Sequence, residues 1–218
     1  MSKIIPYWSG YILKVFIPAL ESYAGIVLDK VFPAFSQEEI EKQADRISGG
    51  NYDPDDSAFQ EALEFYMLMN RSRQGLINTF AAGLYHLFEQ QLSDFYRQVT
   101  SNEGTKFEVF KEIKEKLREI DVDVTKWDAW SSIEELRLLA NCVKHGEGKA
   151  CKDLRQSRPE LFIRPELAEE IKNTPFLKEQ FVTTPLSGNG IYFTVEEFKE
   201  KSMLLKRFWL ALAQKIDQ

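Results

Sequence analysis

The feature that most constrains this chain is a stretch from residue 57 to residue 100 that contains no proline. Apolar side chains recur along it three or four positions apart, the spacing that places them on one side of an α-helix. These side chains are Phe59, Leu63, Tyr66, Met69, Ile77, Phe80, Leu84, Phe88, Leu92, Phe95 and Val99. We therefore predict one long central helix over 57–100. At about 1.5 Å per residue it would extend roughly 66 Å, so we expect a kink near Gly75 or Gly83.

Five capping boxes indicate where helices begin. In a capping box a Ser or Thr side chain accepts a hydrogen bond from the backbone N–H three residues later, and a Glu or Gln at that position bonds back. The boxes are Ser36 to Glu39, Ser57 to Gln60, Thr105 to Glu108, Ser132 to Glu135 and Thr194 to Glu197. Together with an apolar N-terminal segment, they predict core helices over about 7–32, 57–100, 106–119, 132–145 and 195–216.

These helices place the chain in the all-α class, as an up-and-down helical bundle around the long central helix. Nothing in the sequence resembles a flexible linker, so we predict one domain over 1–218. Residues 187–190 contain two glycines and precede Ile191, Tyr192 and Phe193. This order allows a turn into one short β-strand or hairpin before the last helix.

The first thirty residues are apolar, and we expect them to form a largely buried helix that is bent or broken at Pro18. Lys14, Glu21 and Asp29 interrupt the apolar run, which leaves it too short to span a bilayer, and it lacks a signal-peptide cleavage site. We predict a cytoplasmic protein with no membrane partner. Because this helix and the long central helix each need a partner surface, we also predict a homodimer.

Metal and cofactor chemistry are poorly supplied. The chain has two His and two Cys, and Cys142 and Cys151 lack the spacing of a zinc site or a disulfide framework. We expect both cysteines to be reduced, as small apolar fillers. The absence of a glycine-rich phosphate loop, a His-Glu-x-x-His motif and a Gly-x-Ser-x-Gly motif argues against common NTPases, metalloproteases and hydrolases. We predict no metal and no cofactor.

A local basic patch is the main candidate for a function. The net charge of the chain is −6, so its overall field repels nucleic acid, and an RNA site requires such a patch. The predicted helix over 132–145 has one polar stripe, formed by Arg137, Asn141, Lys144 and His145. Its apolar stripe consists of Ile133, Leu136, Ala140 and Val143. The next segment adds Lys149, Lys152, Arg155, Arg158 and Arg164. Such a patch fits an RNA backbone, and an ordinary solvated face is the alternative.

The polar stripe ends in Asn141-x-x-Lys144-His145-Gly146 and follows a long helix, and this arrangement resembles HEPN domains. The resemblance implies an all-helical homodimer of a toxin–antitoxin or antiphage defence system, with an antitoxin or another defence protein as a partner. Many HEPN domains are metal-independent endoribonucleases. The resemblance implies catalytic roles for Arg137, Asn141, Lys144 and His145, in which His145 exchanges a proton with the ribose 2′-hydroxyl or the leaving 5′-oxygen. It implies RNA phosphate binding by Lys149, Lys152, Arg155 and Arg158.

One position departs from the family pattern. HEPN domains often have an Arg directly before the Asn, and this chain has Ala140 there. Arg137 lies about 12 Å from His145 along a helix axis, so the two side chains can share a phosphate only across a dimer. Two interpretations stay open. One is a ribonuclease in which Lys144, Arg155 or Arg158 replaces the missing guanidinium. The other is a catalytically silent module that binds RNA, a nucleotide or a protein partner.

Several residues have a structural interpretation beside a functional one. We expect Gly146 to end its helix with a positive φ, and His145 before it can simply cap the last carbonyl groups. His86 and Glu89 on the central helix fit a hydrogen-bonded core histidine better than an acid–base pair. The two tryptophans of the 127–130 segment fit core or interface anchors better than a base-stacking platform.

Overall fold

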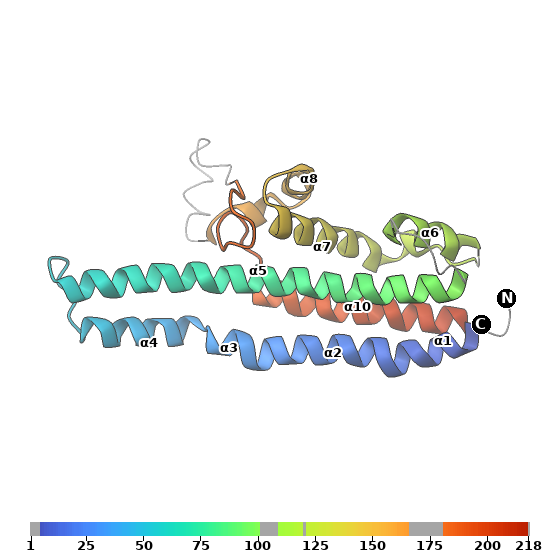
Figure 1. Ribbon diagram of the computed structural model, residues 1–218, viewed down its shortest axis with the longest axis horizontal. Helices are drawn as coiled ribbons and strands as arrows, with labels where there is room; N and C mark the ends of the chain where they lie inside the picture. Colours follow the sequence, from blue (N-terminus) through green and yellow to red (C-terminus); the bar gives the residue numbers. More distant parts are fainter. Residues whose placement is uncertain (1–4, 101–108, 120, 166–180, 218) are drawn as a thin grey trace. The chain divides into compact units, whose positions relative to one another are not determined.

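The computed structural model describes residues 5–100, 109–119, 121–165 and 181–217 (Figure 1). It confirms the all-α class: no β-strand forms in these ranges, and residues 191–193 have no regular secondary structure. The helical elements are α1 (Ile5–Tyr11), η1 (Ile12–Phe16), α2 (Ile17–Ile26), η2 (Val27–Val31), α3 (Phe32–Ala34), α4 (Gln37–Ser48), α5 (Ser57–Thr100), α6 (Val109–Glu119), η3 (Val124–Lys126), α7 (Asp128–His145), α8 (Lys149–Ser157), η4 (Pro159–Phe162) and α10 (Val195–Ile216).

The two longest helices have the predicted bounds. Helix α5 runs over Ser57–Thr100 and continues without interruption through Gly75 and Gly83. Helix α10 covers Val195–Ile216. Apolar periodicity together with the predicted helix starts was therefore sufficient to locate both helices.

The start of α7 corrects a prediction. The helix begins at Asp128, so Ser132 and Glu135 lie in its interior and do not form a capping box. The carboxylate of Glu135 instead forms an ion pair with Lys201, in which Lys201 Nζ lies 2.7 Å from Glu135 Oε1. A Ser and a Glu three residues apart on one helix face match the capping pattern by chance.

The other capping boxes had mixed outcomes. At Ser36 the box is confirmed at its N-cap, because Ser36 Oγ accepts from the backbone N–H of Glu39 at 3.3 Å. For α5 the cap is Asp56, one residue earlier than predicted, and its Oδ1 accepts from the N–H of Ala58 at 2.7 Å. Asp and Ser are about equally favourable at an N-cap, so the capping pattern alone did not distinguish these two neighbours. The box at Thr105 lies outside the described residues.

Two prolines in the N-terminal helical segment are accommodated by π-helical turns. The backbone N–H of Ile17 donates to the carbonyl of Ile12, and that of Phe32 to the carbonyl of Val27, each five residues back. Pro18 and Pro33 follow directly after these donors. A proline ring clashes with the carbonyl four residues before it, and a widened turn relieves the clash. The chain therefore stays helical past Pro18.

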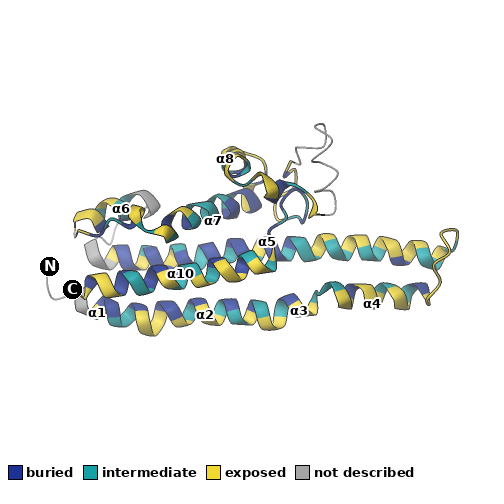
Figure 2. Cartoon of the chain, turned by 180° about the vertical axis from the view of Figure 1, so that it is seen from behind, coloured by how far each residue is buried: buried dark blue, intermediate teal, exposed yellow. Residues whose placement is uncertain are grey.

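The prediction that this N-terminal segment is largely buried is wrong. One face packs inward, while Tyr7 is 67% exposed, Leu13 46%, Val15 40% and Ile26 52% (Figure 2). The stretch Tyr7–Ser48 also contains an 18-residue window with a mean hydropathy of 1.5, of which 33% is buried. By length and composition alone it could cross a membrane, contrary to our expectation from the sequence, and a core helix or a signal sequence has the same properties.

The chain divides into two compact units. The first comprises Met1–Gly25, Ala81–Ala140 and Glu196–Gln218. Its core is a group of aromatic rings around Trp209, which is fully buried. The ring centre of Trp209 lies 4.8 Å from that of Phe16, 5.6 Å from Phe88, 6.1 Å from Phe95 and 5.4 Å from Phe208. These rings come from η1, α5 and α10, so aromatic packing holds the three helical segments together.

The second unit comprises Ile26–Phe80 and Asn141–Val195. Helix α4 lies along the first half of α5 (Figure 1), and the side-chain amide of Gln37 donates to the hydroxyl of Tyr66 at 2.6 Å. The segment before α10 is anchored on α5 by polar contacts. The buried amide of Asn78 donates to the carbonyl of Ile191, and Gln74 donates to that of Phe193, each at 2.9 Å. These bonds position the loop that borders the candidate site.

Candidate functional site where helix α7 meets helix α8

A sharp turn at Gly146 ends helix α7. Gly146 has a φ of 73°, which confirms the predicted left-handed conformation. Its N–H donates to the carbonyl of Cys142 at 2.9 Å. A Cβ at this position would lie 3.0 Å from the carbonyl oxygen of Val182, so the turn also packs closely against the loop before α10. Gly148 differs, because its φ of −179° is extended backbone that precedes α8.

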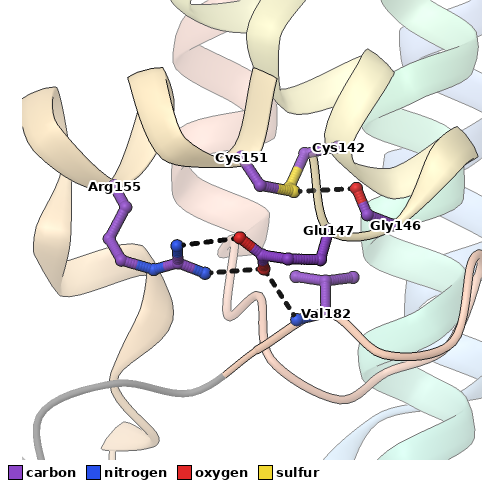
Figure 3. The surroundings of a disulfide bond; sticks show 6 residues. All are labelled: Cys142, Gly146, Glu147, Cys151, Arg155 and Val182. Atoms are coloured by element: carbon purple, nitrogen blue, oxygen red, sulfur yellow. Dashed lines mark hydrogen bonds and ion pairs between the residues drawn. A yellow bond between two sulfur atoms is a disulfide. The ribbon is translucent and has the colours of Figure 1, made fainter. Parts of the chain in front are cut away.

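The turn brings the two cysteines together. Cys142, in the last part of α7, forms a disulfide with Cys151, in the first turn of α8, and their Cα atoms are 4.9 Å apart (Figure 3). Both residues are fully buried, as expected for small fillers, but the expectation that they remain reduced is wrong for this structure. Sequence spacing did not reveal the pair, because only the left-handed turn at Gly146 folds α8 back toward α7.

Glu147 joins the same turn both to α8, through an ion pair, and to the loop before α10, through backbone hydrogen bonds. Arg155 donates to both carboxylate oxygens of Glu147, at 3.0 and 2.9 Å (Figure 3). Glu147 also accepts from the N–H of Val182 at 3.3 Å, and its own N–H donates to the Val182 carbonyl at 2.9 Å. Hydrogen bonding from Arg155 is the main cause that lowers the pKa of Glu147, and the Val182 N–H and the charges of Arg155 and Lys152 add to it against partial burial.

The two arginines predicted to bind phosphate are both engaged by carboxylates. Arg155 is held by Glu147, and its guanidinium carbon lies 4.4 Å from the ring centre of Phe162 and 5.3 Å from that of Phe181. Arg158 pairs with Glu160. Both guanidinium groups therefore have structural roles, which the sequence pattern did not indicate.

Four other basic side chains around the turn are exposed to solvent: Lys144, His145, Lys149 and Lys152. Lys144 and His145 end α7, and the two remaining lysines lie in the first turn of α8. The first helical bond of α8 runs from the N–H of Lys152 to the carbonyl of Gly148 at 3.0 Å. The N–H groups of the preceding residues therefore point out of the helix end, where a helix favours an anion. No acidic residue stands in this first turn. This group of four residues is called the cation cluster below.

The other residues of the predicted site lie differently. Asn141 belongs to the second unit with the cation cluster, whereas Arg137 belongs to the first unit. There Arg137 is close to Tyr85: burial raises the pKa of Tyr85, the charge of Glu89 raises it further, and the charge of Arg137 lowers it. Arg137 thus contributes to the environment of a buried phenol on α5.

The apolar stripe of α7 is confirmed. Its four members are at most 2% exposed: Ile133, Leu136, Ala140 and Val143. Ala140 therefore lies on the buried face of the helix, at 1% exposure. The position at which HEPN domains have their arginine is part of the core of this chain.

Two further predictions concern single residues of the first unit. His86 Nδ1 lies 3.3 Å from Glu89 Oε2, but the two side chains are 40% and 41% exposed. The prediction of a core histidine is therefore wrong, and the two residues form a surface pair. Trp130 is 4% exposed and packs against Phe208, as predicted for a core anchor.

Within the described ranges, no three His, Cys, Asp or Glu side chains gather in a way that could hold a metal ion. The fold and the site together define an all-helical protein with an exposed cation cluster on a cross-linked helix junction. Comparison with known families, curated proteins and solved structures gave no match.

Proposed function

We propose that this chain is a catalytically silent, HEPN-like module that binds RNA through the phosphate backbone. The observation that carries the proposal is the cation cluster, Lys144, His145, Lys149 and Lys152, which is exposed on one helix junction of a chain with a net charge of −6. Lysines with no acid among them in the first turn of α8 favour a bound anion over a solvated surface of mixed charge.

The scaffold beneath the cluster supports binding. A disulfide joins α7 to α8, and Glu147 ties the turn to Val182 and Arg155. Because Arg155 neutralises Glu147, the nearest carboxylate opposes a bound phosphate less than a free one would. These bonds hold the backbone that carries the cluster, so less conformational freedom of the backbone is lost when an anion binds.

Three observations favour binding over cleavage. The family's arginine position is occupied by Ala140, which is buried. Arg155 and Arg158, the predicted replacements for it, are each bound to a carboxylate. Arg137 lies eight residues before His145 on α7 and close to Tyr85. The cation next to His145 in the sequence is therefore a lysine, Lys144. A lysine lacks the forked geometry with which arginine holds a phosphate, so it is a poor replacement for the family's arginine.

The test is fluorescence anisotropy of a labelled 20-nucleotide RNA over a series of salt concentrations. Affinity for RNA decreases as salt increases, so the plot of log affinity against log salt has a negative slope. We expect this slope to become less steep by about 0.7 for each lysine removed in Lys149→Gln and Lys152→Gln. Lys126→Gln is the matched control, because Lys126 is an exposed lysine outside the cluster. The proposal is abandoned if the protein binds no RNA at micromolar concentrations, or if the control weakens binding as much as the cluster variants.

A metal-independent endoribonuclease is the second candidate, and the exposed imidazole of His145 beside Lys144 favours it. In this case the ribose 2′-hydroxyl attacks the adjacent phosphate, the 5′-oxygen leaves, and His145 transfers a proton to or from one of them. Asn141 orients the substrate, and the product carries a 2′,3′-cyclic phosphate. Cleavage that persists in EDTA, spares DNA and disappears in His145→Ala would establish this reading over the silent module.

From the family resemblance we also propose a toxin–antitoxin or antiphage defence system, with an antitoxin or another defence protein as a partner. A cytoplasmic location requires the Cys142–Cys151 bond to resist the reductants of that compartment, where disulfides are rare. We propose a homodimer and assign the exposed apolar side chains Tyr7, Leu13 and Val15 to a second copy, not to a membrane. Sedimentation equilibrium should then show a species of twice the chain mass of 25.3 kDa. A monomer at tens of micromolar that floats with lipid vesicles would reverse this assignment.

A further inference from the structure

An exposed aromatic ring packs on Arg155 of helix α8. Phe181 is 51% exposed, although an apolar ring of this size is usually buried. The guanidinium of Arg155 lies over this ring and also over the buried ring of Phe162. The stack therefore begins in the core and ends at the surface with a half-exposed ring.

The backbone around Phe181 is held in place. Glu147 bonds to both the N–H and the carbonyl group of Val182, the next residue. The carbonyl of Phe181 packs against Gly190, where a Cβ would lie only 2.8 Å from the oxygen and where φ is 85°. The Glu147 carboxylate that binds Val182 also binds Arg155, so the ring and the cation beneath it share one support.

Two exposed lysines of α8 precede Arg155. Lys149, Lys152 and Arg155 are three residues apart, so Lys152 is a neighbour of both Lys149 and Arg155 on the helix surface. Lys152 is close enough to Glu147 for its charge to lower the pKa of that carboxyl group. An exposed aromatic ring that packs on α8 is thus combined with two exposed ammonium groups of the same helix.

We propose that Phe181 is a base-stacking platform, and that the ligand of the cation cluster is single-stranded RNA, with a base on Phe181 and the adjoining phosphates on Lys152 and Lys149. This inference rests on the proposed RNA-binding function and names the form of RNA. An aromatic ring flanked by cations binds single strands, because an unpaired base offers its π-face to the ring. In a duplex the base faces are covered by neighbouring bases, so Phe181 would contribute nothing.

The experiment compares two RNA octamers with the same number of phosphates, one of uridines and one in which all bases are removed. Anisotropy should show that wild-type protein binds the uridine octamer roughly tenfold more tightly than the abasic octamer. Phe181→Leu keeps an apolar cover over Arg155 but removes the π-face, so it should bind both octamers with the affinity of the abasic one. Phe181→Trp should retain the difference.

Tyr52→Leu is the matched control, because Tyr52 is an aromatic residue of the α4–α5 loop with 65% exposure. It should leave both affinities unchanged. If Phe181→Leu binds the uridine octamer as wild type does, while Lys152→Gln weakens both octamers, the platform is refuted and the phosphate site stands. If neither octamer binds, the proposed RNA-binding function fails and the platform fails with it.

Discussion

The aromatic core around Trp209 and the junction of α7 with α8 are stabilised in different ways. In the core, buried rings from three helical segments pack at centre distances between 4.8 and 6.1 Å. The junction is held together by a disulfide, a bidentate ion pair and a glycine in the left-handed conformation. The aromatic packing around Trp209 buries large side chains but presents no polar groups to solvent. The junction can present exposed cations because its support comes from polar and covalent bonds beneath them.

Trp209→Ala should be the most destabilising change. Removing a large buried ring leaves a cavity and typically costs about 3–5 kcal/mol of unfolding free energy. Chemical denaturation should report this loss as a lower midpoint. Tyr52→Ala removes another aromatic ring, but one that is 65% exposed, and should shift stability by less than about 0.5 kcal/mol. Equal effects of the two variants would show that Trp209 does not lie at the centre of the core.

Breaking the Cys142–Cys151 bond should be the next largest effect. The cysteines are separated by nine residues, and closing a loop of this length stabilises a protein by about 2–3 kcal/mol through the unfolded state. Adding dithiothreitol should therefore lower the melting temperature of the wild type. The Cys142→Ala, Cys151→Ala double variant should be insensitive to the reductant. A wild type that melts identically with and without reductant would contradict the bond.

Gly146→Val should destabilise the junction by roughly 1–3 kcal/mol, because a β-branched residue is strained at positive φ. Its Cβ would also press on the Val182 carbonyl, so proteolysis should become faster around this turn. Gly148→Ser is the control, since Gly148 is extended and Ser is favoured before a helix. Unchanged melting of Gly146→Val would mean that the turn is wrongly placed.

Protonation of Glu147 should have the smallest effect. Its pKa is lowered from the ordinary value of 4.5, so the ion pair with Arg155 contributes fully above that pH. The contribution is lost as the pH falls through the lower folded-state pKa. Glu147→Gln lacks this titration, and the difference in stability between wild type and variant should therefore shrink below pH 4.5. A difference that stays constant from neutral pH into this acidic range would argue against the pair.

The core was easier to predict from the sequence than the junction, for physical reasons. The bounds of α5 and α10 follow from apolar periodicity, which is a local property of the chain. The cation cluster and the turn at Gly146 were also predicted from local patterns. The contact of Glu147 with Val182 joins residues 35 positions apart, and no local period encodes it. The start of α7 was missed because Ser132 and Glu135 imitate a cap.

The π-helical turns of the N-terminal segment determine which side chains of the preceding helix face the core. Each turn takes up one residue more than an α-helical turn, which rotates the upstream helix by about 100°. Trp8 lies upstream of η1, and its ring packs 5.8 Å from that of Phe95. Without the extra residue at η1, Trp8 would turn out of the core and a different side chain would take its place. The packing of Trp8 against Phe95 therefore depends on Pro18, ten residues later in the sequence.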